Sequence, residues 1–281
     1  MQAQHYLNLQ VDNDLYFKAD YYYSSGIFVD YGYQLPLKDT AALVQKNATW
    51  KLGQEIYTPS KRYSTNTAEY DYPYSGYLYL QYGQEYRHKI NRGYQWALQM
   101  GWSGAASQAQ RFQNLYHDLV LNLPNLAWVA PQPQLLHAAL SGSYYWAEKV
   151  FPWLLATNRV YAELGTHRTR AGVHFGIVLG KHALVPFNQF TLSQQRKGWG
   201  IYLGTRQEFR SHDFPLEGSA FGHPSAFVVP SNAYRNILEG GITLHNAHWR
   251  LLSSIHAASK DTPRQRKDRH LYLNISIARF F

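Results

Sequence analysis

Hydrophobic and polar residues alternate along most of this chain. Over residues 270–281, one face carries Leu271, Leu273, Ile275 and Ile277, and the other carries Tyr272, Asn274, Ser276 and Ala278. Alternation with a period of two residues is typical of a β-strand whose two faces meet different surroundings. Segments of about ten residues with this pattern, separated by turn residues, indicate membrane-spanning strands.

Eleven other segments show the same pattern, so the sequence predicts about twelve strands. They cover residues 4–12, 26–34, 49–58, 75–88, 92–102, 136–149, 153–166, 169–181, 198–212, 233–245 and 248–260. An even number of strands returns both ends of the chain to the periplasmic side of a bacterial barrel. The segments after the first, third, fifth, ninth and eleventh strands are then extracellular. The connection near 181–197 is long for a periplasmic turn, so either a strand is misplaced there or that turn is elaborated.

One segment, residues 106–121, departs from the alternation. Its apolar side chains Phe112, Leu115, Tyr116 and Leu119 recur at helical spacing, and the segment lacks glycine and proline. This spacing predicts an amphipathic helix with Ser107 as its N-cap. Gln113 and His117 are four residues apart and therefore share one face of that helix.

The composition agrees with a membrane barrel. The chain has 24 tyrosines, 13 phenylalanines and 8 tryptophans but only 16% charged residues, against roughly 25% in soluble domains. Mean hydropathy is nevertheless −0.44, as expected when polar and apolar residues alternate. No run reaches the roughly 18 apolar residues that a spanning helix needs. We therefore expect an all-β, twelve-stranded antiparallel transmembrane barrel that forms one domain, residues 1–281, with a short helix in an extracellular loop.

Cysteine content and net charge limit the classes of function that are possible. The absence of cysteine excludes disulfides, thiolate zinc sites and cysteine nucleophiles. The net charge of +9 favours an anionic partner, either nucleic acid or a phosphorylated membrane surface. Basic residues are spread among the strands except at 264–269, which makes a nucleic-acid partner improbable. The first residues contain no basic and apolar signal segment, so we interpret the sequence as a mature chain with an initiator methionine.

Candidate chemistry lies in the predicted outer loops. The triplet Asp12-Asn13-Asp14 offers closely spaced oxygens that suit Ca²⁺, although such segments are also ordinary turns. The second cluster covers residues 53–59 and 71–79, which also fit a strand, a loop and an aromatic girdle. His117 is one of 13 histidines, so spacing alone does not select it. No G-x-S-x-G elbow is present, which argues against an acyl-serine mechanism.

Six segments, in order, resemble a known family. They are Asn13-Asp14 with the downstream Y-S-S-G, then G-Q-E-I-Y-T-P (53–59), D-Y-P-Y-S-G-Y-L-Y (71–79), the 107–117 helix, A-E-L-G-T-H-R-T (162–169) and L-E-G-S-A-F (216–221). Together they are similar to the outer-membrane lipid A 3′-O-deacylases, the LpxR family, over essentially the whole chain. That family has a twelve-stranded barrel, in agreement with the independent strand count.

The resemblance implies a function and a site. Members of the family hydrolyse the ester that holds the 3′-acyloxyacyl group of lipid A in the outer leaflet of the bacterial outer membrane, with Ca²⁺ and a histidine, at an outward-facing site between the barrel wall and a loop helix. By motif, His117 is that histidine, which activates water, and Gln113 is its neighbour. Asn13 and Asp14 match the family's Asn-Asp pair. Ser24 and Ser25 stand where the family has Thr and Asn.

These matches suggest roles for the residues. Asp14 would hold the metal, Asn13 would orient or ligate it, and Ser24 would position water or substrate. Gln113 would either fix the imidazole or contact substrate. Lys61, Arg62 and residues 264–269 could bind the phosphates of lipopolysaccharide.

Several alternatives remain open at this stage. The protein could be an outer-membrane phospholipase, or a barrel that binds or transports without catalysis. Mg²⁺ or another ion could replace Ca²⁺. The role of Ser25, where the family has Asn, is not defined by the sequence.

Overall fold

Twelve antiparallel strands close into one barrel in the computed structural model, which describes residues 5–17, 19–37, 43–89, 91–181 and 197–281. The strands are β1 (His5–Asn13), β2 (Tyr22–Leu35), β3 (Gln45–Thr58), β4 (Ser75–Lys89), β5 (Arg92–Ser103), β6 (Leu136–Phe151), β7 (Leu154–Gly165), β8 (Arg168–Lys181), β9 (Gly198–Asp213), β10 (Tyr234–His245), β11 (Trp249–Ser259) and β12 (Arg269–Phe280).

Each strand pairs with its neighbours in the sequence, and β1 closes the barrel against β12. Each of the twelve predicted segments overlaps one observed strand, so the predicted twelve-stranded antiparallel barrel is confirmed. β8 and β9 pair directly, which shows that no strand is misplaced between them. The predicted long turn itself, residues 182–196, lies outside the described residues.

The two faces of each strand are inverted relative to a soluble protein. In β12 the polar side chains Asn274 and Ser276 are buried in the barrel, whereas Ile275 and Ile277 point outward and are 37% and 42% exposed. An apolar exterior around a polar interior is the arrangement that hydrocarbon surroundings favour. The alternation in the sequence therefore predicted the correct faces of this strand.

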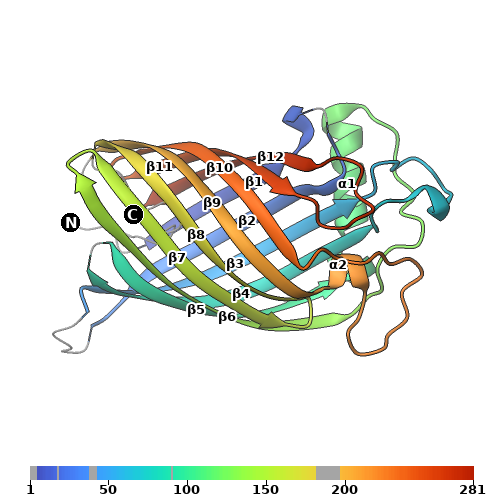
Figure 1. The fold of residues 1–281 in the computed structure, drawn as a ribbon, viewed down its shortest axis with the longest axis horizontal. Coiled ribbons are helices and arrows are strands. Elements are labelled where there is room, and N and C mark those ends of the chain that lie inside the picture. Colours follow the sequence, from blue (N-terminus) through green and yellow to red (C-terminus); the bar gives the residue numbers. More distant parts are fainter. Residues whose placement is uncertain (1–4, 18, 38–42, 90, 182–196) are drawn as a thin grey trace.

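Short helices and long loops gather at one end of the barrel, opposite the end where β1 begins and β12 finishes (Figure 1). The helical elements are η1 (Leu15–Phe17), η2 (Thr67–Glu69), η3 (Gly104–Ser107), α1 (Ala109–Tyr116), the π-turn η4 (His117–Leu121) and α2 (Phe214–Glu217). Among the described residues, no helix is long and apolar enough to span a membrane. We call this the loop end; it brings together residues from most of the long connections.

The predicted helix is shorter than its periodic segment, and its predicted N-cap is wrong. α1 begins at Ala109, and Gln108 is the N-cap, in a left-handed conformation with φ of 56°. Ser107 instead ends the preceding 3₁₀ turn, where its hydroxyl donates to the carbonyl of Gly104 at 2.6 Å. The same hydroxyl accepts from the N–H of Ala109 at 3.3 Å, but the left-handed residue Gln108 separates Ser107 from the helix and takes the N-cap position.

Aromatic packing fixes α1 to the loop end. Tyr74 stacks on Trp128 with ring centroids 5.1 Å apart, and both belong to a buried cluster with Ala109 of the helix. Gly76 at the start of β4 lets the helix approach closely. A Cβ atom at this position would lie 2.2 Å from the Cβ of Ala109. The space that α1 occupies therefore depends on the missing side chain at Gly76.

We expect Gly76→Ala to push α1 away from β4 while the barrel stays closed. An overpacked contact of this kind costs typically 1–3 kcal/mol, so hydrogen exchange in residues 109–116 should accelerate. Gly142→Ala is the matched control, because a Cβ there meets only the carbonyl oxygen of Gln95, at 3.8 Å. Equal exchange in both variants would contradict this account of helix docking.

Candidate functional site

His117 is a buried histidine at the junction of α1 and the π-turn η4. Its side chain is 2% exposed. Its Nε2 atom lies 3.1 Å from Oδ2 of Asp20, and its Nδ1 atom lies 3.3 Å from the carbonyl oxygen of Pro124. The hydrogen bond to Asp20 and its negative charge raise the pKa of His117 above its ordinary 6.5, against the opposing effect of burial. The imidazole thus lies between a carboxylate and a carbonyl oxygen.

Asp20 is where three loop segments converge. Besides His117, its Oδ2 atom pairs with Nε of Arg62 at 3.2 Å. Its Oδ1 atom accepts a weak hydrogen bond from Nε2 of Gln113 at 3.5 Å. Its backbone carbonyl accepts from Oγ1 of Thr58 at 3.1 Å and from Arg62. These contacts hold the carboxylate at a defined position against the imidazole.

Gln113 occupies the helix turn before His117, and its two ends are both engaged. Its Nε2 faces Asp20, and its Oε1 accepts from the indole Nε1 of Trp128 at 2.9 Å. Gln113 therefore contacts the carboxylate partner of His117, and its hydrogen bonds go to Asp20 and Trp128. Trp128 in turn stacks on Tyr74, which links the site to the aromatic cluster that docks α1.

Asn13 and Asp14 lie at the loop end of β1, at the start of the connection that contains Asp20 and leads to β2 at Tyr22. Oδ1 of Asn13 accepts from the backbone N–H of Leu15 at 2.7 Å, which closes an Asx turn. Asp14 is buried, and its Oδ2 accepts from the N–H of Tyr21 at 3.0 Å. Oδ1 of Asp14 has no hydrogen-bond partner among the described residues. Burial raises the pKa of Asp14 well above its usual 3.8, and the negative charge of Asp20 raises this pKa further.

Ser24 sits in a bulge of β2. The pairing of β2 with β3 shifts between Tyr23 and Ser25, so Ser24 has no paired residue on β3. Its buried hydroxyl is 3.4 Å from the carbonyl oxygen of Ile56. A bulge re-aims one side chain relative to its neighbours. This hydroxyl is held against β3 rather than against His117.

The structure thus forms two adjoining groups of the sequence-predicted residues. His117 and Gln113 meet at Asp20, whereas Asn13, Asp14 and Ser24 lie along the ends of β1 and β2. Asp20 itself was missed by the sequence analysis, and Arg62 was considered only as a phosphate ligand. The sequence signal for Asp20 was a single carboxylate directly before the run Tyr21-Tyr22-Tyr23. This carboxylate becomes buried once the loop packs.

The site contains a candidate general base, His117, and a candidate ligand for a cation, Asp14. A buried carboxylate oxygen without a partner is a free ligand position for a hard cation, and a bound cation would offset the cost of burying its charge. The described residues contain no group of three or more His, Asp or Glu side chains that could hold a metal by themselves. A cation at Asp14 would therefore need further oxygens from backbone, amide, water or substrate.

Known proteins place the chain in a family. The sequence profile described as "Outer membrane protein LpxR" matches residues 1–281. The solved structure of LpxR from Salmonella typhimurium superposes with a TM-score of 0.79 at 16% identity, covering 98% of this chain and 100% of that one. The β domain of the Bordetella autotransporter BrkA follows at a TM-score of 0.52 and 10% identity, covering 100% of this chain and 99% of that one.

No curated protein sequence matches the chain. At these identities the two solved structures establish the barrel fold, and the profile match over the whole chain establishes the family. The protein belongs to the LpxR family of outer membrane proteins.

Proposed function

We propose that this protein is a Ca²⁺-dependent esterase that removes the 3′-O-linked acyloxyacyl group from lipid A in the outer leaflet. Membership of the LpxR family supports the substrate and the membrane. The observation that carries the reaction is the buried pair of His117 and Asp20, whose Nε2 and Oδ2 atoms are 3.1 Å apart. A histidine oriented by a carboxylate is the standard pairing for activating water against an ester.

In this mechanism the neutral imidazole carries its proton on Nδ1, which donates a hydrogen bond to the carbonyl oxygen of Pro124. The lone pair of Nε2 accepts the proton of the attacking water, and Asp20, 3.1 Å from Nε2, stabilises the imidazolium that forms. His117 afterwards returns the proton to the leaving sugar alkoxide, so protons balance over the cycle. Asp20, Arg62 and Gln113 position the base and do not touch substrate.

The cation would be held by Asp14, with Asn13 orienting the loop or adding an oxygen. Oδ1 of Asp14 is free for this role, whereas Oδ1 of Asn13 is engaged by Leu15. When bound, Ca²⁺ supplies Lewis-acid polarisation of the ester carbonyl and stabilises the oxyanion. Ser24, at the bulge beside this loop, would position water or substrate through its hydroxyl.

Phosphate recognition falls to the loop between β11 and β12. Arg62 is committed to Asp20, and Lys61 pairs with Glu69 at the surface. Exposed cations of the 264–269 segment, Arg264 and Lys267, remain available at the loop end. Guanidinium and ammonium groups at that position suit the phosphates of lipid A.

We expect His117→Ala to abolish acyl release while the barrel still folds. Mass spectrometry of lipid A after incubation with detergent-solubilised protein should show loss of one acyloxyacyl unit with the wild type only. Heat-modifiable migration on gels checks the fold of the variant. Residual release within about tenfold of the wild type would exclude His117 as the base, because general-base removal costs typically 10²–10⁴-fold. Release of fatty acid from phospholipid vesicles that lack lipid A would instead favour a phospholipase.

We expect Asp20→Asn to lower kcat by about 10²–10⁴-fold and to move the pH profile. The wild-type rate should fall as pH decreases through a pKa above 6.5, because the base must be neutral and Asp20 favours the protonated form. Without the carboxylate, burial lowers the pKa of His117, so the acid limb should shift to lower pH. A lower rate with an unshifted acid limb would mean that Asp20 acts only on the structure.

We expect chelation of Ca²⁺ to abolish activity. We also expect Asp14→Asn to raise the Ca²⁺ concentration needed for half-maximal rate by at least about tenfold, because loss of one charged oxygen weakens a hard-cation site. Calcium titration of the rate, beside equilibrium dialysis with radioactive Ca²⁺, measures both. Mg²⁺ in place of Ca²⁺ tests the identity of the ion. Unchanged Ca²⁺ dependence in Asp14→Asn would remove Asp14 from the metal site.

A further inference from the structure

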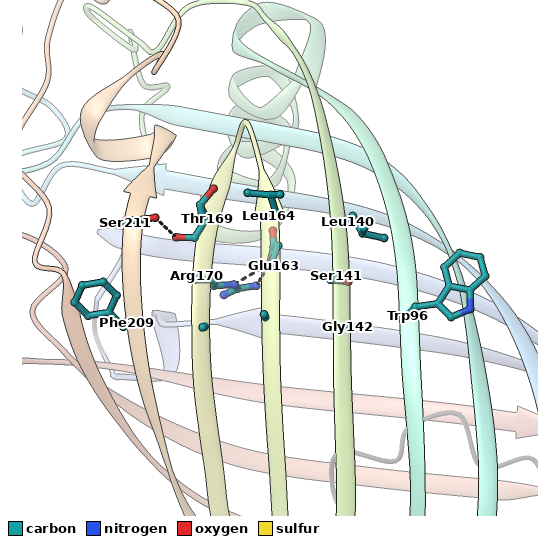
Figure 2. Close-up of a pocket in the computed structure, with 12 residues that line it drawn as sticks. Trp96, Leu140, Ser141, Gly142, Glu163, Leu164, Thr169, Arg170, Phe209 and Ser211 are labelled. Carbon is teal, nitrogen blue, oxygen red and sulfur yellow. Dashed lines mark hydrogen bonds and ion pairs between the residues drawn. The ribbon is translucent and has the colours of Figure 1, made fainter.

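A hollow interrupts the outward-facing wall of the barrel over β5 to β9. Five outward-facing residues pair directly across these strands: Trp96, Gly142, Ala162, Ala171 and Phe209. The three central residues have no side chain beyond a methyl group. Trp96 and Phe209 stand at the two ends of this row (Figure 2). The row therefore forms the floor of a groove between two aromatic walls.

The groove is open and apolar. Its volume is about 590 Å³, and Leu140 and Leu164 extend along the side nearer the loop end. A Cβ at Gly142 would meet nothing closer than 3.8 Å, so the floor is unfilled by the protein itself. Leu164 is 70% exposed and Phe209 is 59% exposed. These apolar side chains rise around a depression instead of covering it.

The floor of the groove lies near the loop end of the wall, since Ala162 is three residues before the end of β7 at Gly165 and Ala171 is three residues after the start of β8 at Arg168. Phe209 lies four residues before the loop end of β9, at Asp213, whereas Trp96 lies four residues from the opposite end of β5, at Arg92. Four strand spacings of about 4.8 Å put the two aromatic walls roughly 19 Å apart. An acyl chain is narrower than this gap, so it fits between the walls in contact with the three small residues of the floor.

Its position selects hydrocarbon as the occupant. The groove is continuous with the exposed apolar residues of the barrel wall, which face the lipid. The Glu163–Arg170 ion pair, 2.7 Å long, comes from the alternate positions of β7 and β8 that face the lumen. Ser141 also borders the groove from the lumen-facing row, where it pairs with Glu163. On the outward face, the hydroxyls of Thr169 and Ser211 add polar groups to the lining, next to the loop end. Surrounding lipid is itself apolar, so retention of one chain would come from close packing in a matching shape.

We propose that this groove binds an acyl chain of a second lipid A molecule, at the wall and apart from the His117–Asp20 site. The choice of lipid A rests on the proposed function. The floor of the groove lies in the part of the wall nearer the end that carries His117, and the proposed function assigns this end to the leaflet of lipid A. The bound lipid would stay with the barrel as a structural neighbour and would not be hydrolysed.

The test fills the groove and counts bound lipid. Full-length protein, wild type or Ala162→Leu/Ala171→Leu, is purified in detergent with lipid A and chelator, so that no turnover occurs, and native mass spectrometry counts the retained lipid. The double variant should retain one lipid A fewer, with the species that carries it at least about tenfold less abundant, equivalent to about 1.4 kcal/mol. Ala257→Leu, on the outward face of β11, is the matched control and should retain lipid A as the wild type does.

Three outcomes would overturn the proposal. Equal retention by the filled variant and the control would show that the groove binds no chain. If excess phospholipid, added to the wild type in a parallel preparation, displaces the extra lipid as well as added lipid A does, the groove would be assigned to membrane lipid in general. Conversion of a dimer to a monomer in the filled variant would assign it to a second copy of this chain. Heat-modifiable migration confirms that each variant is folded before lipid is counted.

The outcome is separable from the test of activity. If the wild type deacylates lipid A while the filled variant keeps every bound lipid, the groove proposal fails alone. If the wild type is inert towards lipid A with Ca²⁺ present but the filled variant loses one bound lipid, the groove stands and the proposed deacylase function fails.

Discussion

Closure of β1 against β12 is the constraint on which the rest of the structure depends. The two strands pair from Tyr6 with Phe280 to Asn13 with Leu273, and this pairing leaves the twelve-stranded sheet without an edge. In hydrocarbon, each unpaired backbone group costs several kcal/mol, so a spanning sheet must close. With both termini at one end, the connections after β1, β3, β5, β9 and β11 all emerge at the other. The site exists because these connections meet there.

Burial of charge is the second organising condition, and Asp20 shows how it is met. A carboxylate removed from water is costly unless cations and donors surround it. Arg62, His117 and Gln113 supply them from two different loops. The mouth of the barrel follows the same rule. Arg235 pairs with Asp213 and with Asp261, each at 2.6 Å. Asp14 is the contrast, because one of its buried oxygens has no partner among the described residues.

The two faces of one strand can serve different purposes because successive side chains point in opposite directions. On β7, Glu163 faces the lumen and pairs with Arg170, whereas Ala162 beside it faces outward and forms part of the groove floor. The lumen holds a cavity of about 480 Å³ whose lining includes the charged residues Glu163, Arg170, Arg206 and Glu239. A substitution on the outward face can therefore change lipid contacts while the charge network inside stays intact.

Local periodicity determined the secondary structure of this protein, and three-dimensional packing determined its site. The alternation predicted all twelve strands and the two faces of β12, because a strand between lipid and lumen must change character at every residue. It placed the start of β2 four residues too late, since the bulge at Ser24 interrupts the pairing there. Helical spacing placed Gln113 and His117 on one face but misassigned Ser107, whose hydroxyl closes the turn before the helix. The pairing of His117 with Asp20 joins residues 97 positions apart. No local pattern encodes such a contact, because it forms only when the barrel brings the first and fifth connections to the same end.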